Sequence, residues 1–522
     1  MIPRLTRAGV RAVAHHLGAL AQLLAACMAA PTLVAVASSE WEPAARYLLS
    51  SGLCLIVGAA LRFAALEKPR LDRTQAIAVT GIAWVFLSLL AAVPLWLSGH
   101  FGGYFDALFE CVSALTTTGV SLAQDLPHLS NADNTWRFAL QLVGGLGFIV
   151  VALSLGLFGR RIDASLYTSE GRSERFIPQV AETARFIART TLAIVVGAAV
   201  ALGFLCLAAG METGRAALHG VWLSIAAFAT GGFAPMPSSV TYYHSFAIEI
   251  VLMVTMLLGA LNFALLLGAR RGRIDEIGRD SEVRTGAIWI AAMTALFTVA
   301  ACGSATFSDT STLLRQGTFT VISTLTTTGF QTLSTNQLMQ VLPSGALLVL
   351  VLLMAVGGCA GSTAGGLKLH RLSIVVKSIS VTCRKALVPE SARMAAEYHH
   401  FGRRTLDDNV SKEAMTVFVL FTATCALGAL AGVAHGQDGL TAIVDSVAMT
   451  SNGGVFSGIV SCDMPASLEF VYLVQMLAGR LEFVTFAAIV IEIVASIVPH
   501  RRMPHGQRSA SAPHAGGDRS RP

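Results

Sequence analysis

Four short segments combine glycine with threonine, serine or asparagine, residue types that can present oxygen ligands to a dehydrated cation. Two of them, Ser113–Val120 and Ser323–Phe330, are nearly identical and share the run Thr-Thr-Thr-Gly, and the others are Ala229–Phe233 and Ser451–Val455. Glycine accepts the backbone angles that turn successive carbonyl oxygens toward one axis. Because carbonyl rings replace the hydration shell of an ion in a selectivity filter, the pattern predicts a filter made of four loops.

The four segments align on their last glycine, which gives one filter position in each of four repeats. The expected filter residues are Thr116, Thr117, Thr118, Gly119, Ala229, Thr230, Gly231, Gly232, Thr326, Thr327, Thr328, Gly329, Ser451, Asn452, Gly453 and Gly454. The ion is expected at Thr117, Thr118, Thr230, Gly231, Thr327, Thr328, Asn452 and Gly453. One such motif alone would favour a helix-packing face, but four in equivalent positions favour the filter.

The composition indicates that these loops are positioned within a membrane. Of the 522 residues, 54% are hydrophobic and 13% are charged, whereas soluble domains are about 45–50% apolar and about 25% charged. This excludes a disordered chain, a nucleic-acid binder and an ordinary soluble enzyme. Apolar runs long enough to cross a bilayer as helices fall at 17–38, 48–66, 75–98, 136–158, 186–210, 242–269, 284–307, 343–376, 411–434 and 466–497.

Four shorter apolar stretches precede the glycine motifs, at 105–115, 216–229, 313–325 and 440–450, and are expected to be re-entrant half-helices. Each lies between two spans, so the repeating unit is helix, half-helix, loop, helix. The predicted fold is an all-α integral membrane protein with four such repeats around a pseudo-fourfold pore. The expected divisions are a two-helix transmembrane unit at 1–72, repeats at 73–160, 161–272, 273–378 and 379–499, and a disordered tail at 500–522.

Basic residues predict the orientation of these helices. Most of the 37 Lys and Arg residues fall in the N-terminus, the tail and the connections 67–74, 159–189, 270–284 and 371–412. The opposite connections hold only Arg46, Arg137, Arg215 and Arg315. Since positive charge marks the cytoplasmic side, both termini are expected in the cytoplasm. Asp and Glu outnumber Arg on the outer side, which concentrates cations there.

The sequence gives no sign of a cofactor. Its nine cysteines are scattered, with no Cys-x-x-Cys pair and no cluster of His and Cys, so neither disulfides nor a zinc site is expected. It also contains no GxGxxG or Walker A motif for a nucleotide. We therefore expect a transporter that holds only the ions in its filter, and no enzyme.

The long run at 343–376 contains five glycines, which are Gly357, Gly358, Gly361, Gly365 and Gly366. Each costs about 1 kcal/mol in a helix interior, so this part is expected to be non-helical. It begins about 20 Å into the membrane, after about 13 helical residues, where irregular backbone must line water or protein. Close helix packing is the alternative explanation of the glycines.

Two basic residues fall within apolar runs. Arg480 lies in the middle of the last span, where a charge must face water or a partner, and Glu482 lies on a different face of that helix. We expect Arg480 to face the pore as a positive barrier to cations, with an ion pair to another repeat as the alternative. Lys368 either holds the glycine-rich loop closed or extends to the cytoplasmic interface.

These features resemble the superfamily of potassium transporters that includes the bacterial Trk and Ktr systems and the plant HKT proteins. The likeness extends over about residues 10–500, and its signature stretches are Trp136-Arg137, Gly144–Gly147, Pro178–Arg185, Gly357–Lys368 and Met476–Glu482. The two additional N-terminal helices and Val180–Arg185 favour the Trk type, the TrkH membrane subunits, over the Ktr type.

The resemblance implies gated potassium uptake across the cytoplasmic (inner) membrane, with K⁺ and Rb⁺ preferred over Na⁺. It implies a gate loop at Gly357, Gly358, Gly361, Ser362, Thr363, Gly365, Gly366 and Lys368, with Arg480 beside the pore. It further implies a homodimer in the lipid bilayer and a cytoplasmic ring of TrkA-like nucleotide-binding regulatory subunits, with no nucleic-acid partner.

Two filter segments depart from the family pattern. Ala229-Thr230-Gly231 has fewer threonines than the first and third repeats, and Asn452-Gly453-Gly454 stands where Asn-x-Gly-Pro-Gly is more usual. These departures affect the expected selectivity and not the architecture. The alternatives are the potassium-binding subunit of a K⁺-pumping ATPase complex, a Na⁺-coupled or less selective Ktr-type transporter, and an inverted-repeat solute symporter.

Overall fold

The computed structural model describes residues 7–63, 71–147, 150 and 180–497, apart from 271, 274, 305, 308, 388–396, 400–402, 407 and 459. The tail expected at 500–522, the division expected between 160 and 161, and most of the connection 159–189 lie outside these residues. Among these residues the regular secondary structure is helical except for a short antiparallel pair, β1 (Glu397–His399) and β2 (Arg403–Thr405).

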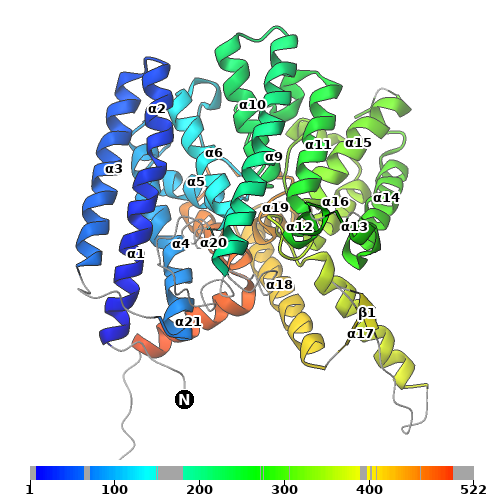
Figure 1. Ribbon diagram of the computed structural model, residues 1–522. Helices are drawn as coiled ribbons and strands as arrows, with labels where there is room; N and C mark the ends of the chain where they lie inside the picture. The colour runs from blue at the N-terminus through cyan, green and yellow to red at the C-terminus, as the bar shows by residue number, and fades with distance from the viewer. Residues whose placement is uncertain are drawn as a thin grey trace, which may run out of the picture.

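The N-terminal unit consists of α1 (Arg7–Cys27), α2 (Ala29–Ala37) and α3 (Trp41–Arg62), which stand together at one edge of the bundle (Figure 1). Ala8–Ala37 forms one apolar stretch long enough to cross a membrane, and α3 forms a second. These correspond to the spans expected at 17–38 and 48–66. α1 contacts α4 of the first repeat, so the unit packs directly on the remainder of the protein.

Each repeat is built from a long helix, a short helix and a second helix. The first helices are α4 (Arg73–Trp96), α9 (Val180–Ala208), α14 (Ser281–Ala301) and α18 (Asp408–Ala434). The short helices are α5 (Tyr104–Thr116), α10 (Thr213–Phe228), α15 (Thr310–Leu325) and α19 (Gly439–Ser451), all within a few residues of the expected half-helices. The second helices are α6 (Asn131–Leu146), α11 (Phe246–Ala260), α16 (Ser344–Val356) and α20 (Ala466–Arg480).

Three of the second helices, α11, α16 and α20, end at a bend or at a non-helical segment. α11 is followed by α12 (Phe263–Arg270) at 102°, and α20 by α21 (Phe483–Ile497) at 113°. α16 ends before a non-helical segment that leads to α17 (Leu369–Lys385). The expectation of continuous helices at 242–269 and 466–497 is therefore wrong, whereas the interruption expected within 343–376 is present. Shorter elements are η1 (Leu126–His128), η2 (Ser239–Tyr243), α13 (Asp275–Arg279) and η3 (Gln337–Val341).

Local backbone chemistry explains the two unexpected bends. At the first, Asn262 Oδ1 accepts a hydrogen bond of 2.9 Å from the backbone N–H of Ala264 and so starts α12 in the manner of a helix cap. At the second, Glu482 has φ +59°, in the left-handed region where an α-helix cannot continue. Neither residue is proline or glycine, so apolar run length gave no indication of a break.

By length and apolar composition, six helices of the described residues can cross a membrane, or up to eight if each bent pair counts as one span. Two further spans were expected. The one at 136–158 corresponds to α6, whose described part ends at Leu146, and the one at 343–376 to α16 with α17. α17 extends below the bundle on the same side as the start of α1 and as α21 (Figure 1).

The helix contacts form a closed cycle. Each short helix packs against the second helix of its own repeat, in the pairs α5 with α6, α10 with α11, α15 with α16, and α19 with α20. It also packs against the second helix of the preceding repeat, in the pairs α10 with α6, α15 with α11, α19 with α16, and α5 with α20. The last pair joins the fourth repeat to the first, so the repeats surround a common centre.

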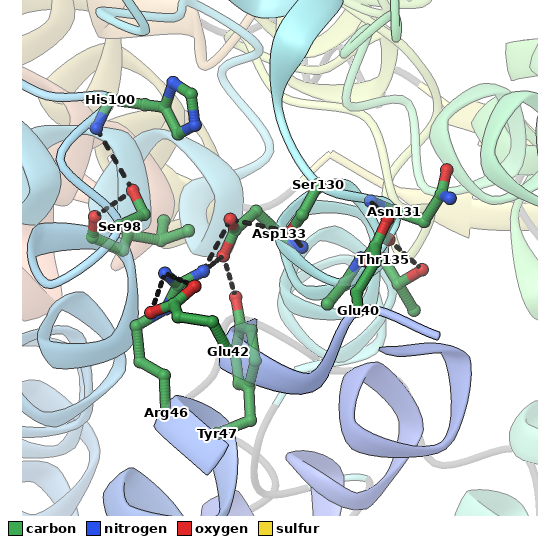
Figure 2. Close-up of polar contacts among 12 residues, drawn as sticks. Glu40, Glu42, Arg46, Tyr47, Ser98, His100, Ser130, Asn131, Asp133 and Thr135 are labelled. Atoms are coloured by element: carbon green, nitrogen blue, oxygen red, sulfur yellow. Dashed lines mark hydrogen bonds and ion pairs between the residues drawn. The ribbon is translucent and has the colours of Figure 1, made fainter. Parts of the chain in front are cut away.

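A buried ion pair fastens the N-terminal unit to the first repeat (Figure 2). Arg46 of α3, which is 6% exposed, donates to the two carboxylate oxygens of Asp133 of α6 at 2.8 and 2.7 Å. Tyr47 donates a third hydrogen bond to Asp133 at 2.8 Å. Glu42 accepts two bonds of 3.0 Å from the remaining Arg46 amine, so this guanidinium is held by two carboxylates.

Candidate ion filter and gate

The four short helices lead into the same unusual turn. Its first residue has a left-handed φ, which residues other than glycine rarely adopt. These residues are Thr117 (φ 59°), Thr230 (51°), Thr327 (54°) and Asn452 (56°). Two positions later comes a glycine with positive φ, namely Gly119 (84°), Gly232 (66°), Gly329 (87°) and Gly454 (114°). The second and fourth repeats thus follow the same turn as the first and third, although their sequences differ.

The four loops also touch one another in the order of the repeats. A Cβ added to a filter glycine would collide with a carbonyl oxygen of the next repeat in three cases, which are Gly119 with Gly231, Gly232 with Thr328, and Gly329 with Gly454. From the fourth repeat, Asn452 Nδ2 donates to Thr118 Oγ1 at 3.3 Å and closes the circle. The structure therefore brings all the expected filter segments together, and at these positions only glycine fits.

Side chains behind the loops hold their outer ends. Ser113 donates to the carbonyl of Val120 at 2.6 Å, and Ser323 donates to that of Phe330 at 2.8 Å, the same contact in two repeats. Glu110 accepts a bond of 2.8 Å from the backbone N–H of Leu122, twelve residues later. Glu110 is itself paired with Arg137 at 2.6 Å, and both are fully buried.

The fourth repeat contains the counterpart of this carboxylate. Asp445 accepts hydrogen bonds from the backbone N–H and the hydroxyl of Ser457, also twelve residues later, at 2.8 and 2.6 Å. Both carboxylates occupy the same place in their repeats, seven residues before the left-handed turn residue. They fasten the loop that leaves the filter, a role that the sequence alone did not indicate for Asp445 or Glu110.

The glycine-rich segment expected to form the gate lies directly against the start of the filter turns. The backbone N–H of Gly365 donates to Thr327 Oγ1 at 2.8 Å, and that of Gly366 donates to the carbonyl of Ser451 at 2.9 Å. Thr230 donates to the hydroxyl of Thr363 at 3.3 Å. The segment thus bonds to the turns of the second, third and fourth repeats at once.

The same segment is tied to the surrounding helices. The Thr363 hydroxyl bonds to the carbonyls of Phe228 at 2.9 Å and Gly259 at 2.8 Å. At α14, the backbone N–H of Ala360 donates to the carboxylate of Glu282 at 3.1 Å. Glu282 was not singled out from the sequence, because one acidic residue at a helix start is usually a cap. Ser362 bonds within the segment, to the carbonyl of Cys359 at 2.6 Å.

Arg480 and Lys368 both reach this segment. Arg480 Nη1 contacts the carbonyl of Thr363 at 3.2 Å and Thr117 Oγ1 at 3.4 Å, and Nη2 donates to the carbonyl of Gly144. It therefore joins the glycine-rich segment to the turn of the first repeat. Lys368 Nζ donates to the carbonyl of Ala364, so its side chain folds back along the segment.

A further ion pair lies next to Arg480. Arg371, in the first turn of α17, donates to Glu482 at 2.6 Å. Glu482 lies at the bend between α20 and α21. Two residues near this bend therefore bind two parts of the gate region: Arg480 bonds to the glycine-rich segment, and Glu482 bonds to α17, the helix that follows this segment. Arg371 and Glu482 lie far apart in the sequence, so the sequence did not predict their ion pair.

Comparisons with known proteins identify the family of this chain. The family model TrkH, described as a cation transport protein, matches residues 45–277 and 283–496. The chain belongs to the TrkH family. This membership confirms the expected relationship to the Trk transporters, and it also confirms that the chain is a transporter and not an enzyme, because the family is one of transport proteins.

Several curated relatives match nearly the whole TrkH-family chain. An uncharacterized cation transporter of Methanocaldococcus jannaschii is 28% identical over 92% of this chain and 96% of its own length. The Trk system potassium uptake protein TrkH of Escherichia coli K12 is 28% identical over 91% of this chain and 97% of its own. TrkH of Halomonas elongata is also 28% identical, over 91% and 97%.

A crystal structure confirms the fold. The potassium transporter TrkH from Vibrio parahaemolyticus is 24% identical to this chain and covers 94% of it, and 98% of that transporter is matched, with a TM-score of 0.77. The expected all-helical membrane architecture is therefore correct for this member of the TrkH family.

Proposed function

We propose that this TrkH-family chain is a gated K⁺ uptake pathway whose filter consists of the four turns at Gly119, Gly232, Gly329 and Gly454. The observation that carries the proposal is the contact of each turn with the next around a closed circle. Two of the relatives are named as potassium uptake proteins, which supports K⁺ as the ion.

The filter acts by replacing water around the ion. The short helices α5, α10, α15 and α19 end at the turns, so the partial negative charge of each C-terminus favours a cation there. Carbonyl oxygens from four turns supply ligands in place of the hydration shell. K⁺ and Rb⁺ are preferred over Na⁺, because turns packed against one another resist closing further around a smaller ion.

The gate is the segment from Gly357 to Lys368, in the conformation that blocks passage. It is bonded to the turns of the second, third and fourth repeats and, through Arg480, to the turn of the first, so an ion leaving the filter meets it. Arg480 adds a fixed positive charge on the same path, which raises the barrier for a cation. Uptake requires the segment to leave this position.

In the cell we propose a multi-pass protein of the cytoplasmic membrane, with both termini in the cytoplasm, where the Lys and Arg residues gather. We further propose a homodimer regulated by a ring of TrkA-like nucleotide-binding subunits. α17 is suited to transmit this control, because it begins directly after the gate and extends from the bundle (Figure 1).

Uptake of radiolabelled Rb⁺ into liposomes that contain the purified chain tests the proposal. K⁺ is expected to compete with Rb⁺ far more strongly than Na⁺ or Li⁺ does. Empty liposomes control for leakage. The Arg480→Ala variant shows whether a lack of uptake by the unmodified chain is caused by a closed gate. Failure of K⁺ to compete with Rb⁺ in either protein would overturn the proposed substrate.

A further inference from the structure

The four filter turns differ at the residue before the filter glycine. This residue is Thr118 in the first repeat, Gly231 in the second, Thr328 in the third and Gly453 in the fourth. In the first and third repeats the threonine hydroxyl shares a hydrogen bond of 2.8 Å with the threonine two residues earlier, Thr116 or Thr326. The second repeat has Ala229 and Gly231 at these positions, so it cannot form this internal brace.

A side chain from the first repeat takes the place of this brace. Gln141 of α6 is 0% exposed, and its Nε2 donates a hydrogen bond of 2.6 Å to the carbonyl oxygen of Gly231. A Cβ added to Gly231 would lie 2.6 Å from Cδ and Nε2 of Gln141 and 2.9 Å from its Oε1. The amide of Gln141 therefore occupies the space into which a residue-231 side chain would extend.

The carbonyl that Gln141 holds lies between two of the proposed filter turns. It is the same oxygen that a Cβ on Gly119 would strike, so it lies at the junction between the first and second turns. Gly231 is followed by Gly232, and two consecutive glycines leave the backbone free to rotate. A hydrogen bond from a fully buried amide fixes the direction of this carbonyl, and the partial positive charge of the donor N–H offsets part of the negative potential of the oxygen.

Gln141 makes this bond at a cost to itself. Among the described residues no donor reaches its Oε1, which is buried. A buried polar atom without a partner is unfavourable, and a methionine at this position would avoid this penalty.

We propose that Gln141 is a positioning residue that sets cation selectivity through the Gly231 carbonyl, in place of the threonine that braces the first and third turns. The proposal rests on the proposed function, because selectivity presupposes that these turns conduct K⁺. Gln141 does not contact the ion itself, and it acts by fixing the second turn where this turn meets the first.

The Gln141→Met variant removes the donor and keeps the size of the side chain. We expect Rb⁺ uptake to persist, while the ratio of K⁺ to Na⁺ competition falls about fivefold, the equivalent of one hydrogen bond of about 1 kcal/mol. Gln475→Met is the matched control: Gln475 is also buried in a second helix but donates to Ser446, Thr450 and the carbonyl of Thr424, outside the filter turns. Its ratio is expected to match that of the unmodified chain.

A compensating set of three substitutions keeps the test decisive if one variant folds poorly. Gly231→Thr alone should lose uptake or selectivity, because its side chain collides with Gln141. Gly231→Thr combined with Ala229→Thr and Gln141→Ala should recover both, because it recreates the threonine pair of the first and third turns and clears the space for it. Gly231 has no positive φ, so its backbone accepts threonine.

The results separate this inference from the function on which it rests. If the unmodified chain takes up Rb⁺ with K⁺ competition and Gln141→Met has an unchanged ratio, the role of Gln141 is overturned and the function stands. A triple variant of Ala229→Thr, Gly231→Thr and Gln141→Ala that is no better than Gly231→Thr alone would also overturn it. Absence of K⁺-competed uptake by both the unmodified chain and Arg480→Ala would instead contradict the proposed function.

Discussion

Asn452 donates a hydrogen bond of 3.3 Å to the hydroxyl of Thr118, 334 residues away in the sequence. Its Nδ2 also bonds to the carbonyl of Met476 in α20 at 2.7 Å. The first and last filter turns are thereby joined to each other and to the helix that packs between them. This contact depends on an asparagine where the other three repeats have threonine.

We expect Asn452→Gly to weaken this junction without straining the turn, because glycine adopts the left-handed φ freely. Loss of the two hydrogen bonds should lower stability by about 1–3 kcal/mol and reduce the preference for K⁺ over Na⁺. Thermal unfolding and competed Rb⁺ uptake measure these effects. Thr118→Val removes the other partner, so the double variant should lose less than the sum of the single losses; strict additivity would show that the bond contributes nothing.

Gly329→Ser should shift the ion preference toward Na⁺. Gly329 has φ +87°, and a side chain there would strike the carbonyl of Gly454, so the third and fourth turns must separate. The competition profile against labelled Rb⁺ measures the shift. Gly345→Ser in α16 is the control, because its nearest neighbour, Ala300 Cβ, is 3.9 Å away. An unaltered profile for Gly329→Ser would mean that Gly329 does not shape the ion path.

Thr363→Val should increase uptake by loosening the gate. The change removes a hydroxyl that bonds to the carbonyls of Phe228 and Gly259, while the shape of the side chain is kept. A loss of about 1 kcal/mol in the blocking position corresponds to about fivefold more of the open form. Initial Rb⁺ flux into liposomes reports this change. Thr382→Val on α17, which loses only a bond to the carbonyl of Ser378, should leave the flux unaltered.

Arg480→Ala should also raise the flux. It removes both the positive charge near the filter and the contacts with Thr117 and Thr363 that hold the gate. Arg480→Lys keeps the charge and loses the forked geometry, so an intermediate flux is expected from it. Equal fluxes for Arg480→Ala and the unmodified chain would contradict the position of Arg480 on the ion path.

Asp133→Asn should destabilise the protein without changing its ion preference. After the change, Glu42 is the one charged carboxylate that remains of the two that bind Arg46. Asp133 is 1% exposed, so the altered ion pair is buried. Breaking a buried ion pair by altering one partner typically costs about 3–5 kcal/mol. Thermal unfolding in detergent should show the loss, while the competition profile stays as before. A changed profile would indicate that the N-terminal unit supports the filter.

The repeated parts of this protein could be anticipated from the sequence, and the contacts between repeats could not. Run length and the recurrence of Gly119, Gly232, Gly329 and Gly454 gave the four units, because glycine and threonine next to a short apolar stretch are a local signal. The bends at Asn262 and Glu482 escaped notice, since each arises from one polar residue within an apolar run.

The residues that hold the site together are also dispersed through the sequence. Gln141 meets Gly231 across 90 positions, and Arg371 meets Glu482 across 111. A single sequence does not show which distant polar side chains face one another, so these contacts required the fold. Arg480 was the exception, because a charge in the middle of an apolar span is conspicuous by itself.

Anomalous diffraction from crystals grown in Rb⁺ or Tl⁺ is the most direct measurement of the central claim. We expect a peak on the axis between the turns at Gly119, Gly232, Gly329 and Gly454, which weakens when K⁺ replaces the heavier ion. An anomalous peak found only away from these turns, or turns found apart and facing lipid, would contradict a filter formed by the four repeats.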